Sequence, residues 1–245
     1  MALCRRPAEG AAMIDPDKVK RFWQGRAAVV GKVAFESVAN LEQDQRNLQL
    51  KIDDETAKVF DWLPDVAGLS VLDLGAGVGQ WTFRFAERGA SRVLAVEYAQ
   101  GLAEVGAAEA GRRGLSQVEF LVCSAEDFDT PETFDLVYIS GLFVYLNDDQ
   151  AERLLDRVIR FVRPGGLLMV RDGTGVTVRH EIDDRFSEHL GEHYSATYRT
   201  RDHYLAAVEG RGFELLRDEN MFEEGHPLNK YPETRLRLFL FRKPA

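Results

Sequence analysis

The sequence predicts an α/β protein with a doubly wound, mostly parallel sheet of seven strands and helices on both faces. Three observations support this prediction. Short apolar runs recur along the chain, apolar residues at helical spacing lie between them, and each connection is long enough for a crossover helix. Because such helices cover both faces of a parallel sheet, its strands are expected to be continuously apolar.

The central part of the chain should alternate strictly between strands and helices. We expect strands at 70–74, 92–96, 118–122, 134–140 and 167–171, and helices at 79–88, 99–113 and 148–162. Apolar residues at helical spacing predict a helical segment over 16–63, and the last part of the chain should add a helix at 201–210 and a β-pair at 213–217 and 235–241. Residues 172–200 show no clear period, which is typical of a functional lid or of short helices.

The bulk composition excludes several classes of protein. A net charge of −9 and a pI near 5.2 disfavour general binding to nucleic acid. Two cysteines, Cys4 and Cys123, provide neither a disulfide framework nor the paired spacing of a zinc site. No apolar stretch approaches the roughly 20 residues that cross a bilayer. We therefore expect a cytoplasmic protein that binds no metal, membrane or nucleic acid.

A glycine-rich stretch, VLDLGAGVGQW at 71–81, follows the first predicted strand of the sheet. Glycines at this point let a ligand approach the backbone, and the helix that follows offers free N–H groups at its positive end. Glu97 ends the next strand, 18 residues after Gly79. Its carboxylate is placed to accept hydrogen bonds from a ribose diol. A nucleotide-like ligand is implied.

The spacing of the glycines distinguishes between nucleotide ligands. Gly75, Gly77 and Gly79 alternate with other residues, whereas a dinucleotide-binding turn has the pattern G-x-G-x-x-G. With Asp73 two residues earlier, the stretch resembles the first motif of the class I S-adenosylmethionine-dependent methyltransferases. The resemblance implies S-adenosylmethionine as cofactor, S-adenosylhomocysteine as product, and cofactor contacts from Ala76 and the glycines, from Glu97 and Tyr98, and from Trp81, which is otherwise a helix-packing residue.

Further stretches resemble the same family, so the resemblance extends over about 70–172. FLVCSAEDF is similar to the motif beside the adenine, with Ser124, Ala125 and Glu126 at the contact positions. The family more often has Asp in place of Ser124, so the contact could shift to Glu126 or Asp127. FDLVYISGLFVYL, which contains Ser140, and FVRPGGLLMV resemble the fourth strand and the turn into the fifth.

The resemblance places the methyl acceptor beyond the carboxyl ends of the strands, near the loop after the fourth. Phe143 and Tyr145 occupy that loop, which lacks the Asn-Pro-Pro-Tyr of enzymes that methylate adenine or glutamine. Tyr145 could bind the acceptor, cover the cofactor or simply pack. Tyr145 and His180 are the candidate catalytic residues, although methyl transfer needs alignment more than acid–base chemistry.

Two segments are expected to close the site. In the N-terminal helical cap, Phe22 and Trp23 would contact substrate, and Arg26 or Lys51 would meet the methionine carboxylate; the alternative is that the two aromatic residues are core anchors and Arg26 a surface charge. In the insertion after the fifth strand, the candidate acceptor-binding residues are Tyr194, Tyr198 and Arg199. His189 and His193 would share a helix face, but no third metal ligand is evident.

We therefore expect a flexible tail at 1–14 and one methyltransferase domain at 15–245, divided into a helical cap (16–63), a cofactor-binding core (69–172), a substrate cap (173–200) and a terminal helix with its β-pair (201–245). The leading hypothesis is methyl transfer to N or O of a small, partly aromatic metabolite, as in specialised metabolism. A protein or peptide methyltransferase, a non-catalytic cofactor-binding protein and, least favoured, an NAD-dependent oxidoreductase are the alternatives. Whether the polar segment 226–237 binds substrate or ties the terminal hairpin to the body, and whether the chain forms a homo-oligomer, is left open.

Overall fold

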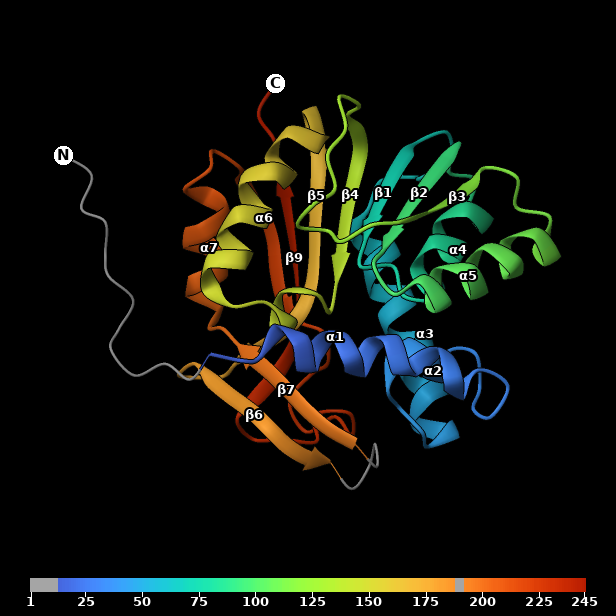
Figure 1. Ribbon diagram of the computed structural model, residues 1–245. Helices are drawn as coiled ribbons and strands as arrows, with labels where there is room; N and C mark the ends of the chain where they lie inside the picture. Colours follow the sequence, from blue (N-terminus) through green and yellow to red (C-terminus); the bar gives the residue numbers. More distant parts are fainter. Residues whose placement is uncertain (1–12, 188–191) are drawn as a thin grey trace.

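A computed structural model describes residues 13–187 and 192–245, and within them seven strands form one twisted sheet (Figure 1). The strands are β1 (Ser70–Leu74), β2 (Arg92–Glu97), β3 (Val118–Val122), β4 (Phe134–Ser140), β5 (Val162–Gly175), β8 (Glu214–Asn220) and β9 (Thr234–Arg242). Their order is β3-β2-β1-β4-β5-β9-β8, and β9 runs antiparallel to both of its neighbours. The predicted doubly wound, mostly parallel sheet and the terminal β-pair are confirmed.

Helices cover both faces of this sheet. They are α1 (Pro16–Gly25), α2 (Ser37–Asn40), α3 (Gln45–Trp62), α4 (Gln80–Glu87), α5 (Gln100–Arg113), α6 (Asp148–Phe161) and α7 (Arg201–Glu209), with short 3-10 helices η1 (Arg26–Val29) and η2 (Phe143–Tyr145). One apolar cluster joins α6 and α7 to the sheet, and a second joins α3 and α4 to it. Alternate residues of each strand enter alternate clusters, so Val71 packs on one face and Leu72 on the other.

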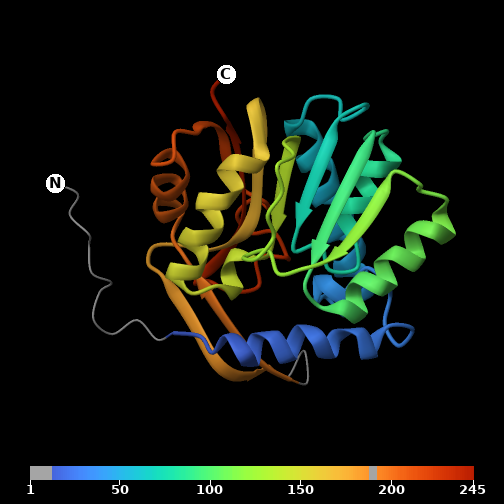
Figure 2. The same cartoon turned by 45° about the horizontal axis from the view of Figure 1, so that its top comes forward.

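The N-terminal cap lies across the carboxyl ends of the parallel strands. Figures 1 and 2 show α1, in blue, running along this edge beneath the sheet. Asp15 caps the helix by accepting hydrogen bonds from the backbone N–H groups of Asp17 and Lys18, and Pro16 starts it. Ile14, expected in the flexible tail, is instead buried and exchanges backbone hydrogen bonds with the Asn147 side chain. The rest of that predicted tail, up to residue 12, lies outside the described residues.

Residues 172–200 were expected to form a lid without regular structure or to contain short helices. Most of this segment is instead an antiparallel hairpin, so that expectation was wrong. Strands β6 (His180–Ser187) and β7 (Glu192–Tyr198) pair with each other and form a separate two-stranded sheet. Figure 1 shows this hairpin, in orange, beside α1. Contacts join β7 to α1 and to η2. The hairpin therefore extends the cap at the carboxyl edge.

Two glycines of α5 provide a matched test of the packing behind the glycine-rich turn. A Cβ atom at Gly106 would lie 2.4 Å from the Phe120 ring and 3.0 Å from the Val78 carbonyl, whereas one at Gly111 would meet nothing. We expect Gly106→Ala to lower the free energy of unfolding by about 1–3 kcal/mol through overpacking. Gly111→Ala should raise it by about 0.4–1 kcal/mol. Urea unfolding measures both, and equal effects of the two substitutions would contradict this packing.

Candidate active site

The glycine-rich turn has the backbone shape that its sequence predicts. Gly75, Gly77 and Gly79 all have positive φ angles, between 59° and 89°, which residues other than glycine rarely adopt. Gly75 and Ala76 donate backbone hydrogen bonds to the Val96 carbonyl, which fixes the turn against β2. The turn then leads into α4, whose first N–H groups face the carboxyl edge of the sheet.

Glu97 connects the end of β2 to this turn. Its Oε2 accepts a hydrogen bond of 2.9 Å from the backbone N–H of Gly77, and its Oε1 accepts one of 2.8 Å from that of Ala99. Burial raises the pKa of the carboxyl group, and these backbone donors oppose the rise. Each carboxylate oxygen keeps a second lone pair. The residue is therefore fixed in orientation and still able to accept hydrogen bonds from a ligand.

The turn and Glu97 line a cavity of about 580 Å³, within the range typical of small-molecule sites. This cavity brings together most of the residues that the sequence singled out: Trp23, Asp73, Gly75, Ala76, Gly77, Trp81, Glu97, Tyr98, Ser124, Ala125, Glu126, Ser140, Tyr145, Tyr194 and Tyr198. Asp127, the alternative adenine contact, also lines it. Glu126 is held by Gln150, whose amide lies 3.2 Å from both carboxylate oxygens.

Several predicted site residues lie elsewhere, because local packing directs their side chains away from the cavity. Gly79 faces the Phe120 ring, and Arg26 donates hydrogen bonds to the carbonyls of Ser37 and Val38 instead of meeting a ligand carboxylate. Phe143 is buried in the core. Phe22 lines a separate hollow beside the hairpin, and the ring of His180 lies against Tyr198. Arg199 enters a buried network.

Three tyrosines line the part of the cavity under the cap. The Tyr145 hydroxyl lies 3.2 Å from that of Tyr194, which in turn lies 3.3 Å from that of Tyr198. Trp23 of α1 packs edge-on against Tyr145, with 5.2 Å between ring centroids. Burial raises the pKa of all three hydroxyls, so they remain protonated near neutral pH and can donate hydrogen bonds.

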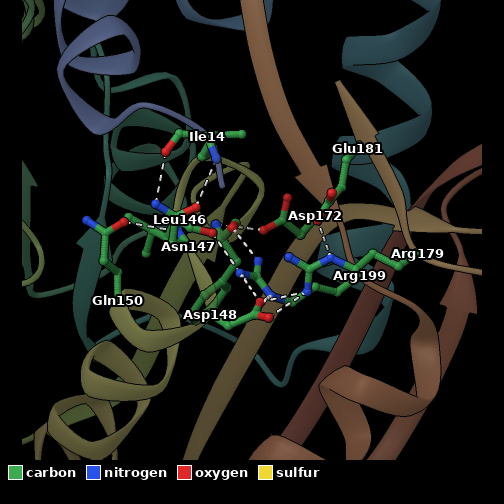
Figure 3. A network of polar contacts seen from close by, with 10 residues as sticks. Ile14, Leu146, Asn147, Asp148, Gln150, Asp172, Arg179, Glu181 and Arg199 are labelled. Atoms are coloured by element: carbon green, nitrogen blue, oxygen red, sulfur yellow. Dashed lines mark hydrogen bonds and ion pairs between the residues drawn. The ribbon is translucent and has the colours of Figure 1, made fainter. Parts of the chain in front are cut away.

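A buried polar network holds the cap on the sheet (Figure 3). Arg199, at the end of the hairpin, donates to the carbonyls of Phe143 and Leu146 at 2.7 and 2.6 Å and pairs with Asp148. Arg179 pairs with the same carboxylate. Asn147 starts α6 with a capping box and also binds Ile14, so one short segment joins α6, the hairpin and the N-terminal segment.

Asp172 positions the loop that carries Tyr145. Its Oδ2 accepts a hydrogen bond of 2.8 Å from the backbone N–H of Phe143, and its Oδ1 accepts one from Gly173. Burial raises its pKa to about 6. No role was predicted from the sequence for Asp172 or for its neighbour Arg171, although both line the cavity. Their place at the end of the fifth predicted strand was the available signal, because ligands of doubly wound sheets bind at the carboxyl ends of strands.

The polar segment 226–237 both borders the cavity and ties the terminal hairpin to the cap. Lys230, Tyr231 and Arg235 line the cavity. Lys230 also forms an ion pair with Glu42, and the Asn229 amide donates to the Glu223 carbonyl. His193 lies on strand β7, so the helical spacing considered for a metal pair does not apply to it, and His189 lies outside the described residues.

Asp73 makes the stability of the protein depend on pH. Burial raises its pKa to about 7, while the Thr82 hydroxyl, which donates to Oδ2 at 2.7 Å, opposes the rise. The folded state therefore holds a proton that the unfolded chain releases near pH 4, and this stabilising contribution is lost as the pH rises towards 7.

We expect Asp73→Asn to remove this pH-dependent loss of stability. The asparagine side-chain oxygen should still accept the hydrogen bond from Thr82. The unfolding free energy of the variant minus that of the wild type should increase with pH between 5 and 7, by up to about 1.4 kcal/mol per unit. Urea unfolding at several pH values measures it. Parallel curves for the two proteins would show that Asp73 titrates normally.

Comparison with known proteins decides which family this arrangement belongs to. The methyltransferase domain family matches residues 71–166, which include the glycine-rich turn, Glu97 and the loop after β4. The stretch 71–166 thus belongs to the methyltransferase domain family. The resemblance to the class I S-adenosylmethionine-dependent methyltransferases is therefore confirmed for the part of the chain that carries the motifs.

Individual relatives agree with this methyltransferase assignment. Phosphoethanolamine N-methyltransferase 1 of Triticum aestivum is 30% identical over 125 residues, which are 49% of this chain and 24% of that protein. Phosphoethanolamine N-methyltransferase 1 of Haemonchus contortus, solved with phosphoethanolamine and S-adenosylhomocysteine, has a TM-score of 0.74 at 19% identity and covers 94% of this chain and 49% of its own. The match to the Triticum aestivum protein thus spans about a quarter of that protein's length.

A second similar structure matches nearly end to end. The 1,6-didemethyltoxoflavin-N1-methyltransferase of Burkholderia thailandensis, solved with 1,6-didemethyltoxoflavin and S-adenosylhomocysteine, has a TM-score of 0.67 at 20% identity, over 98% of this chain and 94% of its own. At this identity the likeness shows a shared methyltransferase fold. Among the residues that the structure describes, no helix is long and apolar enough to cross a membrane.

Proposed function

We propose that this protein binds S-adenosylmethionine and transfers its methyl group to N or O of a small, partly aromatic metabolite. The observation that carries the proposal is one continuous cavity with two differently built parts. The glycine-rich turn and Glu97 line one part, and the three tyrosine hydroxyls line the other. A cofactor and an acceptor held in these two parts would meet at the carboxyl ends of β1 and β4.

The residues of the first part suit the proposed cofactor. The Glu97 carboxylate suits a ribose diol, and the backbone of Gly75, Ala76 and Gly77 offers an approach without side chains. A Cβ atom at Gly77 would lie 2.8 Å from that of Ala39, so the turn could not carry a side chain there. Tyr98 and Ala125 add apolar surface beside the expected adenine position.

S-adenosylmethionine, when bound, supplies an activated methyl group on a sulfonium, so the protein needs chiefly to align the acceptor and exclude water. Helix α1 and the β6–β7 hairpin close the carboxyl edge for this purpose, and the Asp148–Arg199 network fixes the hairpin. Tyr145 is not suited to act as a base, because burial holds its pKa well above the ordinary value. It is suited to position the acceptor by a hydrogen bond.

The size of the cavity and the relatives favour a small acceptor. A cavity of about 580 Å³ has to admit both cofactor and acceptor, which leaves little room for a folded protein substrate. The proteins with similar chains or folds are named for methylating phosphoethanolamine or 1,6-didemethyltoxoflavin. The three aromatic hydroxyls favour an acceptor with both an apolar and a polar part.

Mass spectrometry with deuterated S-adenosylmethionine tests the proposal. The purified protein would be incubated with this donor and a panel of small amines, alcohols and phenols, with short peptides as a second panel. We expect a labelled methyl group on at least one small molecule, together with S-adenosylhomocysteine in equal amount. Transfer to peptides alone, or donor binding without transfer to either panel, would contradict the proposed function.

A further inference from the structure

The cavity is also lined by three cationic residues that lie close enough to influence one another's charge, Lys51, Arg171 and Lys230, hereafter the basic end. Lys51 comes from α3, Arg171 from β5 and Lys230 from the β8–β9 connection. Elements far apart in the sequence thus bring three cations together at the cavity. Neither cofactor binding nor the methyl transfer proposed above uses them.

Two of these cations have carboxylate partners. Arg171 pairs with Glu55 and donates to the Ser140 hydroxyl, and Lys230 pairs with Glu42. The Nε atom of Arg171 is nevertheless buried without a hydrogen-bond partner in the described part of the chain. A buried donor without a partner costs free energy unless a ligand or water satisfies it.

Lys51 is the third cation, and its ammonium group forms no hydrogen bond or ion pair with another described residue. Burial lowers its pKa to about 8, against the attraction of Glu55 and Glu42. The two carboxylates that attract Lys51, Glu55 and Glu42, are already paired with Arg171 and Lys230. Among the described residues Lys51 therefore has no carboxylate partner of its own beside a partly enclosed cavity, where an anion would interact with it strongly.

We propose that the basic end binds an anionic oxygen group of the methyl acceptor, a phosphate, phosphonate or carboxylate, and that Lys51 is its main contact. This inference rests on the proposed function, because it names the class of molecule that the methyl group reaches. An acceptor of this class would place its anionic group between Lys51 and Arg171 and its nucleophilic atom towards Tyr145.

The position of the basic end distinguishes the acceptor from the cofactor. The turn, Glu97 and residues 124–126 follow β1, β2 and β3, whereas Arg171 belongs to β5. Strand β4 separates β1 from β5, so the backbones of these two strands are about 10 Å apart across the sheet. Lys51 belongs with Arg171, because the charges that influence it most are those of Glu55, Arg171, Glu42 and Lys230.

Calorimetric titration of the protein saturated with S-adenosylhomocysteine tests the inference, with inorganic phosphate and acetate as probes at constant ionic strength. The variants are Lys51→Met and Lys51→Gln, and the matched control is Lys32→Met, which removes an exposed charge outside the cavity. We expect one or both anions to bind the wild type, and both Lys51 variants to weaken that binding about tenfold or more. Tighter binding of phosphate would assign a phosphoryl group, and tighter binding of acetate a carboxylate.

The affinity for S-adenosylhomocysteine, measured first in each protein, separates this inference from the proposed function. Equal affinity in the wild type and all three variants, together with loss of anion binding in the Lys51 variants alone, supports the inference. Weaker binding of S-adenosylhomocysteine in the Lys51 variants would assign Lys51 to the methionine carboxylate and overturn it. Absence of anion binding in the wild-type complex, or equal loss in Lys32→Met, would overturn it as well. Failure of the wild type to bind S-adenosylhomocysteine would overturn the proposed function and this inference together.

Discussion

Glu97→Ala is expected to weaken the binding of S-adenosylhomocysteine about tenfold to a hundredfold. Hydrogen bonds to a charged group contribute about 1.5–3 kcal/mol, and this carboxylate is nearly fully buried beside the proposed ribose position. The substitution also removes the acceptor for the Gly77 and Ala99 N–H groups, which loosens the turn itself. Calorimetric titration of the variant measures the loss.

Two further variants separate the role of the carboxylate from general damage. Glu97→Gln keeps the size and one amide oxygen as acceptor, so it should bind S-adenosylhomocysteine more tightly than Glu97→Ala and less tightly than the wild type. Glu104→Ala removes an exposed carboxylate from the neighbouring helix α5 and should have no effect. Unchanged affinity in Glu97→Ala would refute the assignment of this residue to the ribose.

Arg199→Met is expected to lower the free energy of unfolding by roughly 3–5 kcal/mol, because each of two buried carbonyls left without a donor costs about 1–3 kcal/mol. The side chain is only 2% exposed and holds two backbone carbonyls and the Asp148 carboxylate. Its removal would leave the two buried carbonyls without their donor, while Asp148 would keep Arg179 and the methionine would fill the space. Thermal unfolding should show a melting temperature lower by about 10 °C.

The exposed Arg185 on the same hairpin provides the matched control, and Arg185→Met should leave the melting temperature within about 2 °C of the wild type. Because the network fixes the cap and not the glycine-rich turn, Arg199→Met should bind S-adenosylhomocysteine nearly as well as the wild type at temperatures where it is folded. Equal stability of the Arg199 and Arg185 variants would show that the network contributes little.

The core of the fold was predictable because its signals are local. Strands β1, β3 and β4 have the predicted bounds, since each is a short, mostly apolar run between polar turns. The β6–β7 hairpin was not predictable, because His180–Ser187 is polar, contains no buried residue and lacks the alternation of a half-buried strand. The hairpin contacts α1 and η2, and these tertiary contacts cannot be recognised from its own sequence.

The predicted site residues also divide into those that local spacing places and those that only tertiary packing places. The turn and Glu97 belong to one βαβ unit, so spacing alone placed them together. Arg199 and Phe143 were chosen for their type and position, but the sequence does not tell which way a side chain at the end of a strand or in a 3-10 helix points. Lys51 and Arg171 meet only through tertiary packing of α3 on the sheet, so the basic end could not be recognised as a cluster from the sequence.

Calorimetric titration of the purified wild-type protein with S-adenosylhomocysteine, beside an identical titration with NAD, tests the central claim most directly. The glycine spacing, the Glu97 carboxylate and the cavity predict micromolar binding of S-adenosylhomocysteine at one site per chain and no binding of NAD. Binding of NAD alone, or of neither ligand, would contradict the assignment of the glycine-rich turn to S-adenosylmethionine.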